Sequence, residues 1–303
     1  MRVLLLFLTL AATAHADIID DVRSALDQHD IPTAEAQLRT FKAQHGANSE
    51  YLEALSWIGR GELSAQQFDA AQKTAKQTQS LVAQQLKTRK LDSDPHLVTA
   101  LGASYEVQAQ ALDKQGRRAQ AVALLQSAIR TYGTTSIRAR LQKNLNLLSL
   151  VGRAAPEIKQ EQSLGPQAKP LAQLKGSPVL LFFWAHWCGD CKYEAPILTK
   201  LRSEYAAKGL NVVAPTQLYG YAGQGEDAPP VVELAWIDKV RQHFYSGMLD
   251  VPMPISKHNF DTYGASTTPT LVLVDRKGVV DLYHPGLMSY DDLRGAIEKV
   301  VAR

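Results

Sequence analysis

The hydrophobic and polar positions of this 303-residue chain follow two patterns, which change near residue 150. Before that point, apolar residues recur at the three- and four-residue spacing that is typical of helices with one buried face. Between Gly116 and Gly133, for example, Val122, Leu125 and Ile129 fall on one such face. The pattern predicts helices over residues 18–29, 33–45, 49–59, 64–90, 95–115, 117–131 and 135–149.

Proline and glycine agree with these helix boundaries. Pro32 and Pro95 stand near the starts of periodic segments, where a helix tolerates proline. Glycines separate several segments, as expected at helix ends and turns; they are Gly46, Gly61, Gly116 and Gly133. We therefore expect an all-helical domain over residues 17–150.

A different pattern begins with Val179–Trp184, an uninterrupted apolar run with the length and the β-branched or aromatic character of a fully buried strand. A helix is predicted after it, from Lys192 to about Lys208. Further strands are expected over 210–214, 250–256, 270–275 and 279–283, and further helices over 231–246, 258–263 and 290–301. This order predicts an α/β fold with a mixed central sheet and helices on both of its faces.

Turn-forming residues concentrate in two stretches. Residues 152–177 contain Gly165-Pro166 and several other prolines, which is typical of a turn-rich connection. We therefore place the second domain at residues 151–303. Residues 215–230 form a long loop that is rich in glycine and tyrosine.

The N-terminal residues have the pattern of a secretory signal peptide. A short positive head, Met1-Arg2, precedes the apolar run Val3–Leu10 and the exit Ala14-His15-Ala16. The apolar run is shorter than the roughly 20 residues that a membrane-spanning helix needs. We predict cleavage after Ala16, with residues 1–16 as the signal peptide, and an exported protein that resides in the periplasm. No cysteine lies near the cut, so a lipid anchor is not expected there.

Composition adds few constraints. A hydrophobic content of 45% is that of an ordinary globular protein. The formal charge of +3 comes without any block of lysine and arginine, so a nucleic-acid partner is not indicated.

The chain has only two cysteines, Cys188 and Cys191, separated by two residues at the start of a predicted helix. Unpaired backbone N–H groups and the helix dipole stabilise a thiolate at that end. We therefore predict a redox-active disulfide in which Cys188 attacks as the nucleophile and Cys191 resolves the mixed disulfide. A purely structural disulfide is the alternative, but so small a loop stabilises little in the chain-entropy model. The carboxylate of Asp190 opposes ionisation of its neighbours, which favours a reductase over a strong oxidant.

The longer pattern Trp187-Cys188-x-x-Cys191-x-x-Glu194-x-Pro196 follows a buried strand, and a Thr268-Pro269 pair lies downstream. This arrangement resembles the thioredoxin superfamily, and in particular its extracytoplasmic TlpA and ResA branch, from about Ala155 to the C-terminus. The resemblance implies a thioredoxin-like fold and a thiol–disulfide oxidoreductase that needs no cofactor. Its expected partners are protein disulfides and an upstream thiol–disulfide electron donor. It also implies a lead-in hairpin of two short strands between Ala155 and Gly176.

The resemblance assigns roles to single residues. Glu194 is expected to be the buried carboxylate that exchanges protons with the cysteines, because Phe182 occupies the strand position where cytoplasmic thioredoxins carry a buried aspartate. Thr268-Pro269 is expected to form a cis-proline turn facing the disulfide, with the backbone near Thr268 open to a substrate peptide. Trp187 is expected to be half-exposed beside the disulfide.

Other aromatic residues and His186 allow simpler interpretations. Trp184 is expected to serve as packing. For His186 we favour a surface position over a role in tuning Cys188. Tyr219 and Tyr221 either line a substrate groove or are ordinary loop tyrosines.

The helical part has its own resemblance. Leu101-Gly102-x-x-Tyr105, followed by Gly116, Ala119 and Ala128, is similar to one tetratricopeptide repeat, without a second copy at a fixed period. Two functions remain open for this domain: docking of a partner, or a helical cap that stabilises the second domain.

Two alternatives to an oxidoreductase follow from the same residues. One is a thioredoxin-fold metallochaperone that binds a soft ion such as Cu(I) through Cys188, Cys191 and either His258 or His284. A zinc site of four cysteines cannot form within a chain that has two. The other is a helical scaffold with a vestigial redox domain.

Overall fold

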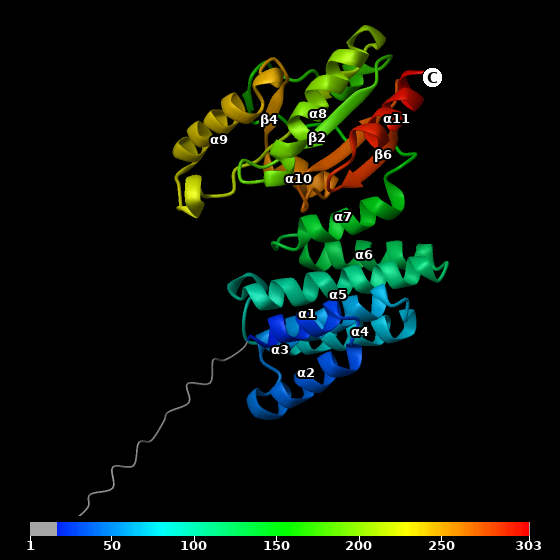
Figure 1. Ribbon diagram of the computed structural model, residues 1–303, viewed down its shortest axis with the longest axis vertical. Coiled ribbons are helices and arrows are strands. Elements are labelled where there is room, and N and C mark those ends of the chain that lie inside the picture. Colours follow the sequence, from blue (N-terminus) through cyan, green and yellow to red (C-terminus); the bar gives the residue numbers. More distant parts are fainter. Residues whose placement is uncertain (1–16, 303) are drawn as a thin grey trace, which may run out of the picture. The chain divides into compact units, whose positions relative to one another are not determined.

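The computed structural model describes residues 17–302, and Figure 1 shows its helices and strands. The predicted signal peptide lies outside the described residues. The chain divides into two compact units, one up to Ala111 and one from Leu112 onward. Among residues 17–302, no helix is both long and apolar enough to cross a membrane.

The first unit is built of helices. Its elements are α1 (Ile18–Asp27), α2 (Ile31–His45), α3 (Ser49–Ser64), α4 (Phe68–Gln85), a 3₁₀ turn at Leu91–Ser93, and most of α5 (Pro95–Lys114). The expectation of an all-helical N-terminal region is confirmed.

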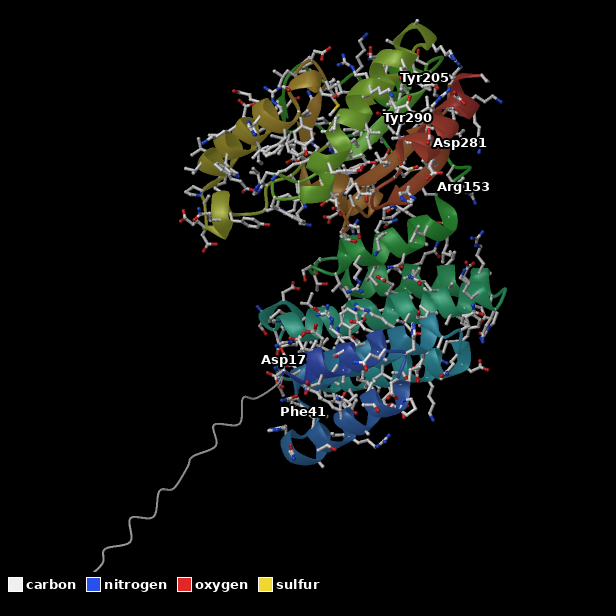
Figure 2. All side chains as sticks on the ribbon, viewed as in Figure 1. Asp17, Phe41, Arg153, Tyr205, Asp281 and Tyr290 are labelled. Carbon is white, nitrogen blue, oxygen red and sulfur yellow. A yellow bond between two sulfur atoms is a disulfide. The ribbon has the colours of Figure 1, made fainter. Side chains whose placement is uncertain are left out.

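Side chains cap the first three of these helices. The Asp17 carboxylate, labelled in Figure 2, accepts a hydrogen bond from the Ile19 N–H at 2.9 Å. The Asp30 carboxylate accepts a hydrogen bond from the Thr33 N–H at 3.0 Å, and the Asn48 side-chain oxygen accepts one from the Tyr51 N–H at 2.9 Å. Such caps satisfy N–H groups that have no partner inside the helix, so they determine where each helix begins.

The prediction that a helix ends near Gly61 is wrong. Helix α3 continues to Ser64, and the break falls at residues 65–67, where Gln66 has a positive φ of 60°. Gly61 serves close packing instead, because a Cβ at this position would lie 2.5 Å from a side-chain carbon of Leu26 in α1. The next helix, α4, is correspondingly shorter than the predicted segment 64–90.

The second unit contains α6 (Arg118–Tyr132), α7 (Arg138–Ser149) and the α/β part of the chain. The strands are β1 (Gln162–Leu164), β2 (Val179–Phe183), β3 (Asn211–Val213), β4 (Met253–Ile255), β5 (Thr270–Val274) and β6 (Val280–Pro285). The helices among them are α8 (Gly189–Tyr205), α9 (Pro230–Phe244), α10 (Lys257–Tyr263) and α11 (Tyr290–Val301).

Four strands form the central sheet, in the order β3-β2-β5-β6. Strand β2 pairs with β3 in parallel and with β5 antiparallel, and β5 pairs with β6 antiparallel. The predicted mixed sheet is therefore confirmed, and β5 and β6 form a hairpin at one edge of it (Figure 1).

Strand β2 is buried on both faces because its side chains alternate between two apolar clusters. Leu180 and Phe182 point into a cluster that contains residues of α8, α9 and α11. Leu181 and Phe183 point into the opposite cluster, to which α10 contributes Phe260 and Tyr263. This double burial explains why the sequence of β2 is uniformly apolar.

Helix α7 packs against α10. Gly264 follows α10, and a Cβ at this position would lie 2.2 Å from the backbone nitrogen of Lys143 in α7. Only glycine therefore permits this close approach. The Asn146 side chain donates to the Thr262 carbonyl at 3.4 Å, and Leu150 belongs to the same apolar cluster as Phe183. The last predicted helix before residue 150 thus contributes to the core of the α/β part.

The predicted lead-in hairpin is wrong. Only β1 forms a strand in that region, and it pairs with the distant β4 rather than with a neighbour in sequence. The second predicted strand is a 3₁₀ turn at Leu171–Leu174. The Glu157 carboxylate stabilises this turn by accepting hydrogen bonds from the N–H groups of Leu171 and Ala172, both at 2.8 Å.

Candidate active site

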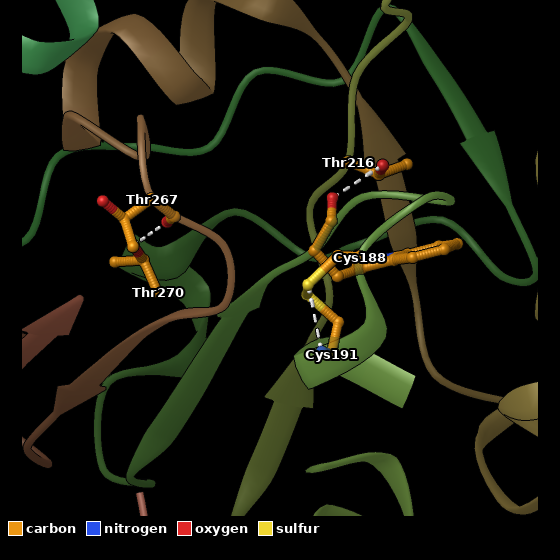
Figure 3. Close-up of a disulfide and its surroundings, with 6 residues drawn as sticks. Cys188, Cys191, Thr216, Thr267 and Thr270 are labelled. Atoms are coloured by element: carbon orange, nitrogen blue, oxygen red, sulfur yellow. Dashed lines mark hydrogen bonds between the residues drawn. A yellow bond between two sulfur atoms is a disulfide. The ribbon is translucent and has the colours of Figure 1, made fainter. Parts of the chain in front are cut away.

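The two cysteines form a disulfide where β2 leads into α8 (Figure 3). Cys188 caps the helix, and its sulfur accepts a hydrogen bond from the Cys191 N–H at 3.0 Å. Cys188 is 3% exposed and Cys191 is fully buried. The first sulfur therefore lies at the positive end of the helix dipole, where a thiolate is stabilised.

The segment before the disulfide is anchored to the end of β3. The Trp184 carbonyl accepts a hydrogen bond from the Thr216 hydroxyl at 2.9 Å, which Figure 3 marks with the dashed line at Thr216. The Trp184 indole N–H donates to the Ala214 carbonyl at 3.0 Å. Trp184 is completely buried, so its predicted role in packing is confirmed.

Glu194 is fully buried within α8, one turn beyond Cys191. Its Oε1 accepts a hydrogen bond from the Met288 N–H at 3.2 Å, and its Oε2 has no partner among the described residues. Burial raises the pKa of this carboxyl to about 7, and the negative charge of Asp190 acts in the same direction. Glu194 is therefore a buried carboxyl, as expected, and does not lie on the solvated face of its helix. Pro196 lies inside the same helix, as predicted.

The Thr268-Pro269 peptide bond is cis, as the family resemblance implies. It precedes β5, and the Thr270 hydroxyl donates to the Thr267 carbonyl at 2.6 Å. Figure 3 shows this short segment in the surroundings of the disulfide. The hydroxyl oxygen of Thr268 is buried and has no hydrogen-bond partner among residues 17–302.

Trp187 is 48% exposed, which confirms the half-exposed position expected for it. Its ring packs edge-on against Tyr219, with 5.5 Å between the ring centroids. An apolar surface is therefore available directly beside Cys188.

The prediction that His186 lies on the surface is wrong. Its side chain is 1% exposed, because residues of the long 215–230 loop pack over it. The rings of Tyr219 and Tyr221 contact it with centroid distances of 5.8 and 5.3 Å. Both loop tyrosines therefore contact the residue that lies two positions before Cys188.

Sequence reasoning did not identify Glu233, a buried residue in the first turn of α9. Its Oε1 lies 3.4 Å from the His186 Nε2. Burial lowers the pKa of His186, and the carboxylate of Glu233 opposes that shift. The one available signal was an acidic residue shortly after Pro229-Pro230, the pattern of a helix start.

The two histidines considered as metal ligands have other partners. The His258 ring lies 3.3 Å from the Thr262 hydroxyl, and the His284 ring lies 3.0 Å from the Leu287 carbonyl. Within residues 17–302, no group of three or more histidine, cysteine, aspartate or glutamate side chains is arranged to hold a metal ion.

Comparison with known proteins places this site in a family. A family model described as Redoxin matches residues 150–296. The thioredoxin-like protein YneN of Bacillus subtilis is 31% identical over 148 residues, which cover 48% of this chain and 78% of that protein. The chain belongs to the redoxin family.

A further relative and a solved structure are similar to about half of this redoxin. The thiol-disulfide oxidoreductase ResA of Oceanobacillus iheyensis is 28% identical over 163 residues, covering 52% of this chain and 77% of that protein. A solved structure described as a thiol:disulfide interchange protein DsbE from Chlorobium tepidum is 27% identical, with a TM-score of 0.38. The matched region covers 50% of this chain and 97% of the solved chain. This redoxin is a thiol-disulfide oxidoreductase with a thioredoxin-like fold, as the resemblance implied.

Proposed function

We propose that this redoxin is an exported reductase of protein disulfides. The observation that carries the proposal is the juxtaposition of a disulfide at the start of α8 with a fully buried carboxyl one turn further on. The pKa of that carboxyl, about 7, is suited to exchanging protons at neutral pH.

In the proposed reaction, the Cys188 thiolate attacks one sulfur of a client disulfide. The client S–S bond breaks as a mixed disulfide forms, and the released client sulfur takes up a proton. Cys191 then loses its proton to Glu194 and attacks the Cys188 sulfur. The second client thiolate leaves and is protonated. The client has gained two electrons and two protons, and the enzyme ends as the Cys188–Cys191 disulfide.

Glu194 is proposed as the group that accepts the proton of Cys191 and later returns it. A carboxyl with an ordinary pKa would be ionised at neutral pH and would hold a proton poorly. Burial raises the pKa into the working range, and the Met288 N–H, which favours the charged form, limits the shift. Glu194 can therefore both accept and donate without a large energetic penalty in either direction.

Trp187 and the Thr268-Pro269 turn are proposed as the substrate-binding surface. Trp187 offers an exposed ring face beside Cys188. The cis turn leads into β5, and an extended client segment could pair with backbone in its vicinity. Clients and an upstream dithiol donor would use the same surface in turn.

Export is proposed from the signal-peptide pattern at the N-terminus, with the periplasm as the compartment. An oxidising compartment supplies the protein disulfides that a reductase acts on. The helical part is proposed either to dock a partner or to cap the α/β part.

The reduction potential of the purified mature protein tests the direction of the reaction. Asp190 lies in the first turn of α8 beside the disulfide and disfavours the thiolate, which leads us to expect a reducing couple. We expect a potential more negative than roughly −180 mV, the value typical of a disulfide isomerase. A potential near that of the strong oxidants, roughly −120 mV, would rule out the proposed reductase.

A further inference from the structure

The reaction above makes no use of Glu233, although this carboxylate is as buried as Glu194. It stands in the first turn of α9, which begins directly after the 215–230 loop. Taking an ionised carboxylate out of water is energetically unfavourable unless hydrogen-bond donors surround it. The groups that contact Glu233 therefore indicate which part of the structure it stabilises.

Each oxygen of Glu233 has a backbone donor from the loop. Oε1 accepts a hydrogen bond from the Tyr219 N–H at 2.5 Å, and Oε2 accepts one from the Gly220 N–H at 2.8 Å. Oε1 also lies 3.4 Å from the His186 Nε2. One side chain thus joins α9, the loop and the residue that precedes Trp187. Hydrogen bonds to an ionised acceptor are among the stronger ones in proteins.

Tyr219, whose backbone N–H binds Glu233, also places its ring against Trp187, the residue proposed to contact substrates. Tyr219 packs against His186 and, at 5.5 Å between ring centroids, against Trp187. Trp187 is half-exposed and adjacent to Cys188 in sequence. Within residues 17–302, the hydrogen bonds and the ion pair of Glu233 do not involve either cysteine.

We propose that Glu233 is a positioning residue for polypeptide substrates, an inference that rests on the reductase function proposed above. By holding Tyr219 against Trp187, Glu233 shapes the surface that receives the chain around a client disulfide. It acts through Tyr219 and leaves the chemistry at sulfur to Cys188, Cys191 and Glu194. A small disulfide, which contacts little beyond the sulfurs, does not depend on Glu233, whereas a disulfide within a peptide does.

The variant Glu233→Gln tests this role. The substitution removes the charge and turns an N–H donor toward one of the loop N–H groups, so the loop loses one anchor. The matched control is Asp238→Asn, which alters a partly exposed acid on the same helix. Enzyme kept reduced by an added dithiol is turned over with a short peptide closed by one disulfide and, separately, with oxidised glutathione, and the uncatalysed reaction with the dithiol is subtracted. KM, kcat and the reduction potential are measured for each variant.

We expect Glu233→Gln to lower kcat/KM for the peptide by about tenfold, mainly by raising KM, as is usual when a positioning contact is lost. The rate with oxidised glutathione and the reduction potential should stay at the values of the wild type and of Asp238→Asn. An equal loss with both disulfides, a shifted potential, or an unchanged KM for the peptide would overturn the proposal.

A second variant guards against a folding failure and tests the route through Tyr219. Tyr219→Leu removes the ring but keeps the backbone N–H that Glu233 binds, and it should raise KM for the peptide in the same way. In the double variant, Glu233→Gln should then add little further loss, because both changes act on one contact. Additive losses, or a folded Tyr219→Leu with an unchanged KM for the peptide, would show that Glu233 does not act through this surface.

Discussion

The backbone N–H of Met288 donates a hydrogen bond to the Glu194 carboxylate over 3.2 Å, although the two residues are 94 positions apart. Met288 lies three residues after the end of β6, so the segment that follows this strand contacts the carboxyl of Glu194. This contact favours the charged form of Glu194, while burial favours the neutral form more strongly. The carboxyl is held near the midpoint of its titration at neutral pH.

Replacing Glu194 with glutamine should separate its effect on the pKa of Cys188 from its effect on the rate of reduction. Without a neighbouring carboxylate, the thiolate forms more easily, so the apparent pKa of Cys188 should fall. The rate of disulfide reduction should nonetheless drop by roughly 10²–10⁴, the range associated with losing a positioned acid–base group. Thiol alkylation against pH and single-turnover reduction measure the two quantities.

The matched control for this variant is Glu204→Gln, a partly exposed residue later in the same helix. It should leave both the alkylation profile and the rate unchanged. If Glu194→Gln behaves like this control, the proton of Cys191 must leave by a route other than Glu194.

Glu194 should also make the stability of the oxidised protein depend on pH. Its pKa is about 7 in the folded protein and about 4.5 when unfolded, so the folded state binds more protons between these values. The contribution of Glu194 to the free energy of unfolding should therefore be highest below about pH 4.5 and fall as the pH rises to about 7, by at most roughly 1.4 kcal/mol per pH unit.

Urea unfolding of the oxidised protein at several pH values checks this prediction. The cysteines do not titrate in the disulfide, so the difference between wild type and Glu194→Gln isolates the carboxyl. The glutamine variant should gain stability relative to wild type as the pH rises through this window. A difference that does not change with pH would contradict a raised pKa for Glu194.

The two cysteines should behave differently when each is replaced by serine. Cys188→Ser should abolish disulfide reduction, because the remaining thiol is completely buried. Cys191→Ser should accumulate mixed disulfides with clients, since the resolving thiol is missing. Non-reducing gels of both variants after incubation with oxidised client extract show the adducts. Adducts on Cys188→Ser and none on Cys191→Ser would mean that the two roles are exchanged.

The α/β part should fold and react without the first unit, but α7 should matter to its stability. A fragment from residue 154 keeps the disulfide, Glu194 and the cis turn, so it should still reduce a generic disulfide. It lacks Leu150 and the α7 contacts with α10, so it should be less stable than a fragment from residue 112 by at least about 2 kcal/mol. Thermal unfolding and activity of both fragments test this, and an insoluble or inactive fragment from 154 would place the boundary earlier.

The sequence alone determined those features that depend on local spacing. The apolar run of β2, the helix after it and the two cysteines are neighbours in the chain, so strand, helix start and disulfide could be inferred together. Glu194 follows Cys191 by three residues, and the periodicity of a helix brings such residues onto one side. The cis turn at Thr268-Pro269 followed from the family resemblance.

Tertiary structure decided the features that join distant segments. His186 looked like a surface residue because nothing near it in sequence indicates that Tyr219, Tyr221 and Glu233 cover it. Strand β1 was expected to pair within a hairpin, yet its partner β4 lies about 90 residues further along the chain, as the register of Gln162 with Ile255 shows. Strands pair through backbone N–H and C=O groups, which are the same for nearly all residue types. The sequence of a short strand therefore does not show which other strand it pairs with.

Gly61 illustrates the same limit in the helical part. Glycine ends helices often enough to predict a break there, but in this chain its missing Cβ admits Leu26 from another helix. Whether a glycine is a helix end or a contact point depends on what packs against it. Packing is a property of the folded molecule, because it requires side chains from separate elements to occupy the same region of space.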